Sequence, residues 1–296
     1  MKRMRILLLG SGGQLGWEVH RQLFCLGDVF AYDYPQIDLT KPNEIVKLIQ
    51  NDKPDLIYNA TAYTAVDRAE SDEKNARMVN ATTPGEIAEN CQKRGIGLIH
   101  VSTDYVFDGQ KGGDYVEIDK PNPLNVYGKT KYEGEEYISQ SGCMHLIFRT
   151  SWVYSRRKGG FLEKVFDWAR TNRELRIVVD QIGNPTWARM LAVLTTSTIM
   201  PKGQEFITGF FEQHHGLYHL GGKGAVSRFE FTKAIIDFLP ESDPLRQTRI
   251  LTAMTVDFPS PAARPAHSAL NCDKFEKDFG IQIPAWHESL QLSLIS

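Results

Sequence analysis

The feature that most constrains the fold of this chain is a glycine loop near its start. Gly10, Gly13 and Gly16 follow the apolar run that ends at Leu9, in the stretch GSGGQLGWEV. Glycines at this spacing allow a tight turn and let the backbone approach a pyrophosphate, which then lies at the positive N-terminus of the following helix. Asp33 follows at the end of the next predicted strand, where a carboxylate can bind a ribose. The loop therefore predicts a dinucleotide-binding unit.

The rest of the first half alternates segments with strand and helix patterns. Continuous apolar runs are typical of strands buried on both faces of a sheet, and apolar spacings of three to four residues are typical of helices. This alternation predicts an α/β fold, a Rossmann-type doubly wound parallel sheet. The expected strands are 5–9, 28–33, 54–61, 96–103 and 145–154, and the expected helices are 14–24, 41–50 and 75–95. For the helix over 41–50 we expect Thr40 as N-cap and Pro42 in the first turn.

Past residue 150 the regular alternation of strand and helix patterns ends, and we expect a second lobe. We assign residues 1–150 to an NAD(P)-binding Rossmann domain and residues 151–296 mainly to a smaller C-terminal substrate-binding lobe. Segments near 174–187 and 215–230 are expected to return to the first domain. Because no linker marks the boundary, the two lobes are expected to share a cleft.

Composition argues against several classes of protein. The formal net charge of −2 argues against a nucleic-acid binder, which usually carries a basic face. No run of about 18 apolar residues occurs, so no membrane span is expected. The four cysteines are scattered without a C-x-x-C pair, which favours reduced thiols in a cytoplasmic protein.

Asp33 also bears on the choice of cofactor. A carboxylate at this position accepts hydrogen bonds from the adenosine ribose and disfavours a 2′-phosphate. No Arg or Lys follows it in the stretch DYPQIDLT to attract one. The expected cofactor is therefore NADPH or NADH, with NADH used at least as well as NADPH.

Two Tyr-x-x-x-Lys pairs occur, and their context separates them. Tyr127 and Lys131 fall in NVYGKTKYEGE with helical phase, so the ammonium lies one turn from the phenol and can lower its ordinary pKa of about 10. Tyr154 and Lys158 fall in VYSRRKGG, after a strand and without helical phase. Thr103 ends a predicted parallel strand, where α/β sheets bind ligands. We therefore expect Tyr127 to act as the acid and Thr103 to hold a substrate carbonyl.

Together these residues resemble the extended short-chain dehydrogenase/reductase superfamily, which combines such a glycine loop with Thr and Y-x-x-x-K. Within that superfamily the chain is similar to the dTDP-4-dehydrorhamnose reductase family. The segments that carry the similarity are GSGGQLGWEV, NATAYTAVDRAE, VSTDYVFDG, PLNVYGKTKYEGE, FRTSWVY, DQIGNPT and, near residue 264, ARPAHSALN.

The resemblance implies a role for each matched position. Thr103, Tyr127 and Lys131 match the catalytic residues, and Lys131 would also bind the cofactor ribose. Trp152 would line the sugar pocket, although it could equally pack in a core, and Arg264 is either a diphosphate ligand or a surface arginine. With Asp33 included, the expected cofactor-binding residues are Gly10, Gly13, Gln14, Leu15, Asp33, Asp38, Leu39, Ala60, Ala62, Tyr63, Tyr127 and Lys131. The expected substrate-binding residues are Thr103, Asp104, Trp152 and Arg264.

The implied activity is the NAD(P)H-dependent reduction of the 4-keto group of dTDP-4-dehydro-L-rhamnose to dTDP-L-rhamnose, in nucleotide-sugar biosynthesis. Some members of the family bridge two protomers through Mg²⁺ held by glutamates. Glu18 matches one such ligand, but Arg189 stands where another glutamate would be needed. A homodimer therefore stays open, whereas a metal-bridged dimer and any other metal site are not expected.

Two alternatives also stay open. One is another nucleotide-sugar reductase or epimerase of the same superfamily, since Tyr105 in place of a glutamate argues only against a 4,6-dehydratase. The other is a non-catalytic binding protein of the same fold, such as the regulatory subunit of methionine adenosyltransferase. Net oxidation of the cofactor by a keto sugar would distinguish a reductase from an epimerase and from a binding protein.

Overall fold

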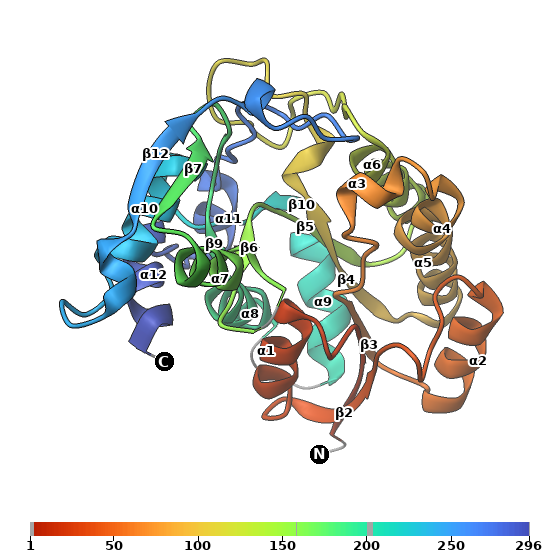
Figure 1. Ribbon diagram of the computed structural model, residues 1–296. Coiled ribbons are helices and arrows are strands. Elements are labelled where there is room, and N and C mark those ends of the chain that lie inside the picture. Colours follow the sequence, from red (N-terminus) through yellow and green to blue (C-terminus); the bar gives the residue numbers. More distant parts are fainter. Residues whose placement is uncertain (1–2, 158, 200–203, 296) are drawn as a thin grey trace.

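The computed structural model describes residues 3–157, 159–199 and 204–295, and it confirms the α/β fold class (Figure 1). Its centre is a six-stranded sheet in the order β10-β5-β4-β3-β1-β2, in which all neighbouring strands are parallel. Because β2 and β3 lie on opposite sides of β1, the strand order reverses there, and such a switch point is where these sheets bind ligands. The strands are β1 (Met4–Leu9), β2 (Gly27–Tyr32), β3 (Leu56–Asn59), β4 (Gly97–Thr103), β5 (His145–Thr150) and β10 (Gly216–His219).

Helices cover both faces of this sheet. Ile6 and Leu8 of β1 face a core shared with α1, α8 and α9, whereas Leu7 and Leu9 face a core shared with α2, α5 and α6. Burial on both faces explains why the strand reads as a continuous apolar run. These helices are α1 (Gln14–Leu23), α2 (Pro42–Asp52), α5 (Thr83–Arg94), α6 (Val126–Gln140), α8 (Ala188–Ser197) and α9 (Gln204–His214).

The helix expected over 75–95 is formed by three consecutive pieces. α4 (Glu73–Arg77) continues into a π-helical turn (Met78–Thr82) and then into α5. Gly95 ends the run with a φ of +65°, a left-handed conformation that favours glycine.

The expectation that Thr40 caps α2 is wrong. The residue before α2 is Lys41, and it provides no side-chain cap. The Thr40 hydroxyl instead donates to Asp38 Oδ1 (2.7 Å), which also accepts from the Thr40 N–H (3.0 Å). The aspartate two residues earlier thus binds the threonine in a local turn.

A further core lies around Phe231, apart from the two cores of the main sheet, and the elements that pack on it are called the second lobe below. We expected the segment near 174–187 to return to the first domain, but its strand β7 pairs in parallel with β12. The reason is that Leu175 and Ile177, the alternate residues of β7, are buried in this second core. From the segment near 215–230, β10 does lie in the six-stranded sheet.

The remaining elements are short or belong to the second lobe. Within the described ranges, no helix is both long and apolar enough to cross a bilayer. The elements are α3 (Val66–Ala69), β6 (Val153–Tyr154), α7 (Phe161–Thr171), β7 (Glu174–Val178), β8 (Ile182–Gly183), β9 (Thr186–Trp187), β11 (Val226–Ser227), α10 (Arg228–Asp237), β12 (Arg249–Ala253), α11 (Asp273–Phe279), α12 (Trp286–Ile295) and three 3₁₀ turns (Asp104–Val106, Pro244–Gln247, Thr255–Asp257).

The strand expected over 145–154 is interrupted where the chain enters the second lobe. β5 ends at Thr150, and Trp152 has a φ of +45°, which is rare for a bulky side chain. Gly183 makes room for the indole, because a Cβ there would lie 2.7 Å from Trp152 Cε2. Beyond this turn β6 pairs with β9 and not with the main sheet.

Candidate active site

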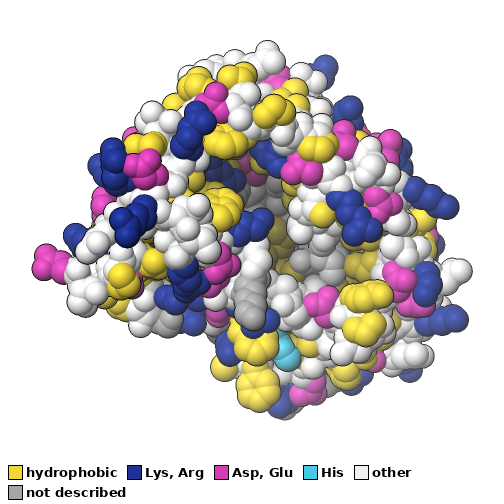
Figure 2. Space-filling view, in the orientation of Figure 1, with side chains coloured by type: hydrophobic (Ala, Val, Ile, Leu, Met, Phe, Trp, Pro, Cys, Tyr) yellow, Lys and Arg dark blue, Asp and Glu magenta, His cyan; other side chains and the backbone are white. Residues whose placement is uncertain are grey.

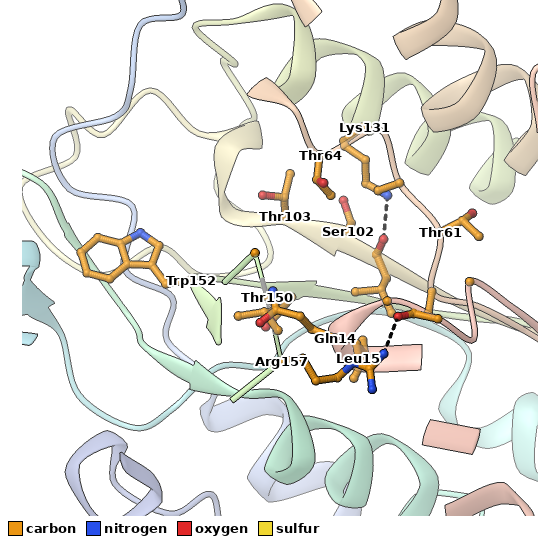
Figure 3. Close-up of a pocket in the computed structure, with 18 of the residues that line it drawn as sticks. Gln14, Leu15, Thr61, Thr64, Ser102, Thr103, Lys131, Thr150, Trp152 and Arg157 are labelled. Carbon is orange, nitrogen blue, oxygen red and sulfur yellow. Dashed lines mark hydrogen bonds between the residues drawn. The ribbon is translucent and has the colours of Figure 1, made fainter. Parts of the chain in front are cut away.

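A cavity of about 950 Å³ lies beside the glycine loop at the carboxyl ends of β1, β3 and β4. Figure 2 shows a hollow between the lobes on this face of the molecule, and Figure 3 shows the side chains that line the cavity. Its wall combines segments that lie far apart in the sequence. Of the predicted site residues, the following line it: Gly10, Gly13, Gln14, Leu15, Asp33, Ala60, Ala62, Thr103, Asp104, Tyr127, Lys131 and Trp152.

Three predicted cofactor ligands lie outside this wall. The Asp38 carboxylate is bound to Thr40, whose hydroxyl holds the Asp38 pKa below its ordinary value. Leu39 packs in the core beneath the sheet. The Tyr63 hydroxyl donates to Asp72 (2.9 Å). Cofactor binding by these three residues thus stays a prediction, without support from the cavity lining.

The glycine loop has the close backbone contacts that a dinucleotide requires. Gly10 has a φ of +84°, and a Cβ at Gly16 would lie 1.9 Å from the Gly10 carbonyl oxygen. Only glycine therefore lets α1 start this close to the end of β1. Gly13 precedes α1 without a side-chain cap, so the first N–H groups of the helix stay available to an anion. This geometry fits the pyrophosphate of a dinucleotide.

Tyr127 and Thr103 line the cavity from two different elements. The Asn125 side chain accepts a hydrogen bond from Gly128 N (2.8 Å), which starts α6 and puts Tyr127 in its first turn. Burial raises the pKa of Tyr127, and a hydrogen bond with the Thr103 side chain opposes this rise. We expected the Lys131 ammonium to lower this pKa. In this structure the Lys131 Nζ contacts His100 and the Val101 carbonyl instead of the Tyr127 hydroxyl.

Lys131 is almost fully buried, and its Nζ donates to the Val101 carbonyl (2.7 Å) and lies 3.1 Å from His100 Nε2. Figure 3 shows the first of these hydrogen bonds as a dashed line. Burial lowers the pKa of Lys131 to about 8, and the Glu135 carboxylate opposes this shift. Burial also lowers the pKa of His100 well below its ordinary value, so this imidazole is neutral.

The partners of His100 indicate where its single proton lies. Asn59 Oδ1 accepts from both the N–H (3.1 Å) and the hydroxyl (2.5 Å) of Thr61, so the Asn59 amide turns its NH₂ toward His100 Nδ1 (3.1 Å). Because a neutral imidazole has one N–H, accepting at Nδ1 places that proton on Nε2, facing Lys131. An N–H at this position opposes the charge of the Lys131 ammonium, in line with the lowered pKa, but a pKa of about 8 leaves the ammonium form predominant at pH 7.

Asp104 is the polar support of Thr103. Its Oδ1 accepts from the Thr103 hydroxyl (3.1 Å), and its Oδ2 accepts from Ser151 (3.0 Å) and Ser268 (2.5 Å). Burial raises the Asp104 pKa to about 6, and these three hydroxyls limit the rise. The carboxylate holds the Thr103 hydroxyl, which lines the cavity beside Tyr127. Because Asp104 also lines the cavity, its direct contact with substrate stays a prediction.

A second cavity, of about 910 Å³, adjoins the first, with Thr64 in both walls. Arg264 lines it and donates to Asp67 (2.8 Å). Arg228, at the start of α10, also lines it; its guanidinium carbon lies 3.5 Å from the centroid of a Trp152 ring and 4.7 Å from that of Phe161. Burial lowers the pKa of Arg228 to about 10, so it stays a cation at neutral pH.

Several residues of the site were missed from the sequence. Arg157 lines the first cavity and donates from Nη2 to Gly12 O (3.2 Å), while Asp33 Oδ2 accepts from Gly12 N (2.6 Å). No Arg or Lys follows Asp33 in the stretch DYPQIDLT, but the fold brings Arg157 to the same glycine that Asp33 binds. No local pattern marked the others, which are Thr64, His100, Thr150, Arg156 and Arg228.

Glu18 and Arg189, which were compared with metal-bridging glutamates, and the core histidine His219 all make ordinary contacts. Arg189 Nε lies 3.3 Å from Glu18 Oε2, so the arginine found at the proposed ligand position pairs with the matched glutamate. His219 Nδ1 contacts the Tyr115 carbonyl (3.0 Å) within the core. In the part of the chain that the structure describes, no group of three or more His, Cys, Asp or Glu is arranged to hold a metal ion.

Comparison with known proteins gives the chain a family. Residues 4–295 match the family model described as "RmlD substrate binding domain". A relative named dTDP-4-dehydrorhamnose reductase, from Burkholderia thailandensis, is 39% identical over 292 residues, which are 98% of this chain and 97% of the relative.

Solved structures agree with this similarity. A dTDP-4-dehydrorhamnose reductase from Clostridium acetobutylicum has a TM-score of 0.89 at 31% identity, over 99% of both chains. One from Bacillus anthracis, in complex with NADP, has a TM-score of 0.88 at 30% identity, also over 99% of both chains.

Proposed function

The chain belongs to the dTDP-4-dehydrorhamnose reductase family, and we propose that the two adjoining cavities are where this activity takes place. The protein is an NAD(P)H-dependent oxidoreductase that reduces the 4-keto group of dTDP-4-dehydro-L-rhamnose to give dTDP-L-rhamnose. The observation that carries the site assignment is that the glycine loop, Thr103, Tyr127 and Lys131 line one cavity.

We propose a division of labour between the two lobes. Residues 1–150 hold the dinucleotide, because the glycine loop, Asp33 and the carboxyl ends of β3 and β4 line the first cavity. Residues 151–296 mainly hold the substrate, since α7, β7 and Arg228 form much of the wall of the second cavity. Trp152 lies at the junction, where it lines the first cavity and stacks on Arg228.

In this proposal Tyr127 donates the proton to the substrate oxygen, and the Thr103 hydroxyl turns its one proton from Asp104 to that oxygen when the substrate binds. The bound nicotinamide supplies the hydride. Asp104 keeps the Thr103 hydroxyl in place (3.1 Å). Lys131 stands one turn along α6 from Tyr127 and, as the ammonium, would stabilise the phenolate left behind. His100 and the Val101 carbonyl fix the position of its nitrogen.

The second cavity fits an anionic nucleoside diphosphate. Five cationic residues line it (Arg68, Lys164, Arg176, Arg228 and Arg264) against two acidic ones (Asp67 and Glu174). No described carboxylate lies within 4.0 Å of the nitrogens of Arg228, so its guanidinium can pair with a phosphate. Trp168 and Phe258 add aromatic surface against which a base can stack.

We propose that the enzyme acts in the cytoplasm, in line with its four free cysteines, and that a dimer, where formed, needs no Mg²⁺ bridge. The basis of the second statement is that the Arg189 cation already pairs with Glu18 (3.3 Å). Native mass measured with and without EDTA tests it, and a dimer that dissociates in EDTA would overturn it.

An absorbance assay of cofactor oxidation tests the function itself. The dTDP keto sugar should oxidise one NAD(P)H per sugar, faster than the UDP and GDP keto sugars at equal concentration. Product analysis should show the 4-hydroxy sugar. A rearranged sugar without net cofactor oxidation would indicate an epimerase, and binding without turnover would indicate a regulatory protein.

A further inference from the structure

Arg157 reaches the glycine loop from the segment that follows β6. Its Nη2 donates to the Gly12 carbonyl (3.2 Å), and its guanidinium carbon lies 4.2 Å from the centroid of a Trp17 ring on α1. Figure 3 shows the side chain at the cavity with this hydrogen bond dashed. One of the five N–H donors of Arg157 is thus used by the loop, and the planar group is held in place by the indole.

The segment that carries Arg157 is itself fixed to α1. The Ser155 hydroxyl donates to Gln14 Oε1 (2.8 Å) and accepts from the Arg157 N–H (3.2 Å). Arg157 is therefore placed by contacts on both its backbone and its side chain. Such preorganisation lowers the entropy lost when the guanidinium binds a ligand.

Asp33 lies on the other side of the same glycine. Its Oδ2 accepts from Gly12 N (2.6 Å), and its Oδ1 accepts from Tyr34 N (2.8 Å). This carboxylate follows the end of β2, a position from which a carboxylate can bind ribose hydroxyls and repel a phosphate on the 2′-oxygen. Because Arg157 and Asp33 bind the carbonyl and the N–H of the same glycine, the cation can offset that repulsion.

We propose that Arg157 binds the 2′-phosphate of the adenosine ribose and so allows the protein to use NADPH in spite of Asp33. This inference rests on the proposed function, because it takes the first cavity as the dinucleotide site. A guanidinium with free N–H donors suits phosphate oxygens, and a ribose between Asp33 and Arg157 would present its 2′-position to both.

Two neighbouring arginines show what is particular to Arg157. Arg156 also lines the cavity, but it pairs with Glu163 (3.2 Å). None of the described acidic residues pairs with Arg157 in this way. Arg21 lies at the same 4.2 Å from a Trp17 ring centroid, yet it does not line the cavity. Arg21 is therefore a matched control, a cation stacked on the same indole without access to the ligand.

The test is calorimetric binding of 2′,5′-ADP and of 5′-ADP, which differ in the 2′-phosphate and contain no nicotinamide. We expect Arg157→Met to lower the affinity for 2′,5′-ADP roughly 10- to 100-fold, the loss typical of one charge-assisted phosphate contact. Binding of 5′-ADP should change less than about threefold, because it lacks the group that Arg157 contacts. Arg21→Met should leave both affinities unchanged. The kcat/KM ratio of NADPH to NADH should fall with the 2′,5′-ADP affinity.

The other outcomes separate this inference from the function on which it rests. An equal loss of affinity for both nucleotides in Arg157→Met would show that the residue only holds two segments of the chain together. An unchanged affinity for 2′,5′-ADP would show that Arg157 does not contact the phosphate. Either result would overturn the inference and leave an NADH-dependent reductase standing. Failure of the unaltered protein to bind either nucleotide would overturn the inference and the dinucleotide site together.

Discussion

Tyr127 and Tyr154 begin two Tyr-x-x-x-Lys sequences, and the structure places them in opposite surroundings. Tyr127 lines the large cavity beside Thr103, and Lys131 lies one turn further along α6. Tyr154 is fully buried in the core of the second lobe, where its ring packs on Phe231 with centroids 5.2 Å apart. Lys158 lies outside the described residues. Access to the cavity therefore distinguishes the two tyrosines.

The pKa of both phenols is raised by burial, so the pKa alone does not identify the acid. What differs is the neighbour that opposes the rise. For Tyr127 it is the side chain of Thr103, which lines the cavity, and for Tyr154 it is Ser293 of α12, within the lobe. A proton on Tyr127 has a route to a bound substrate, and one on Tyr154 has none.

The largest expected effect is that of Tyr127→Phe. Removing only the hydroxyl should leave the fold intact and lower kcat roughly 10²- to 10⁴-fold, which corresponds to about 3–5 kcal/mol of barrier. Steady-state kinetics at saturating cofactor, with circular dichroism to check folding, measures this. A kcat within a factor of three of the unaltered protein would remove the distinction between the two tyrosines.

Lys131→Met should change how the free energy of unfolding depends on pH, which tests whether the lysine that follows Tyr127 is buried. The folded pKa of Lys131 is about 8 against an ordinary value of 10.5, so between these values the unfolded chain binds the extra proton. The free energy of unfolding contributed by this residue therefore rises with pH across that window, by on the order of 3 kcal/mol. Urea unfolding from pH 7.5 to 10.5 should show this slope and lose it in Lys131→Met. Parallel curves for the two proteins would show that the amine is not buried as described.

Arg228→Met tests the second cavity, which is proposed to bind the substrate. Arg228 lines this cavity and stacks on Trp152, two residues before Tyr154. Losing one phosphate contact should raise the KM for the keto sugar roughly 10- to 100-fold, about 1.4–2.7 kcal/mol, with a smaller change in kcat. Arg170→Met is a suitable control, since Arg170 is exposed and pairs with Asp167 on α7 (2.7 Å), and neither residue lines the second cavity. Equal effects of the two substitutions would argue against a phosphate site at Arg228.

Asp104→Asn should have a smaller effect that depends on pH. The Asp104 pKa of about 6 means that the carboxyl group becomes neutral below that pH, so that it accepts from the Thr103 hydroxyl without the added strength of a charge. The kcat/KM of the unaltered protein should therefore fall as pH drops through about 6. At neutral pH the kcat/KM of the variant should be roughly 3- to 10-fold lower, which corresponds to one hydrogen bond. The variant should also lack the fall in kcat/KM near pH 6. A fall that persists in Asp104→Asn belongs to another group.

The smallest expected effect is that of Tyr154→Phe. Its kcat should stay within about twofold of the unaltered protein, and its free energy of unfolding should fall by about 1 kcal/mol or less, since one buried hydroxyl is removed. Urea unfolding and the cofactor assay measure the two quantities. A large loss of kcat without a loss of stability would reverse the assignment.

Local patterns were sufficient for the sheet and for part of the site. Leu7 and Leu8 of β1 face opposite cores, and the run of apolar residues therefore showed a strand covered on both faces. The spacing of Tyr127 and Lys131 depends only on helical phase, and α6 contains both. Gly10 was recognisable because its place after a strand already constrains the backbone.

Tertiary placement explains what the sequence did not reveal. Arg157 and Arg228 lie 145 and 76 residues from Gly12 and Trp152, the groups they contact, so nothing in their own neighbourhoods marked them. His100 read as one more residue of a buried strand, and only the packing of α6 showed that it faces Lys131. The prediction that Thr40 caps α2 was wrong because of a local contact: the hydroxyl of Thr40 is bound by Asp38, two residues earlier.

Single-turnover stopped-flow measurement tests the assignment of Tyr127 most directly, because it isolates the chemical step. Enzyme saturated with reduced cofactor is mixed with dTDP-4-dehydrorhamnose, and the loss of nicotinamide absorbance is followed for the unaltered protein, Tyr127→Phe and Tyr154→Phe. We predict that Tyr127→Phe slows this step at least about 100-fold and that Tyr154→Phe matches the unaltered protein within about twofold. A slow step in Tyr154→Phe together with a normal one in Tyr127→Phe would contradict the assignment of the acid to the tyrosine that lines the cavity.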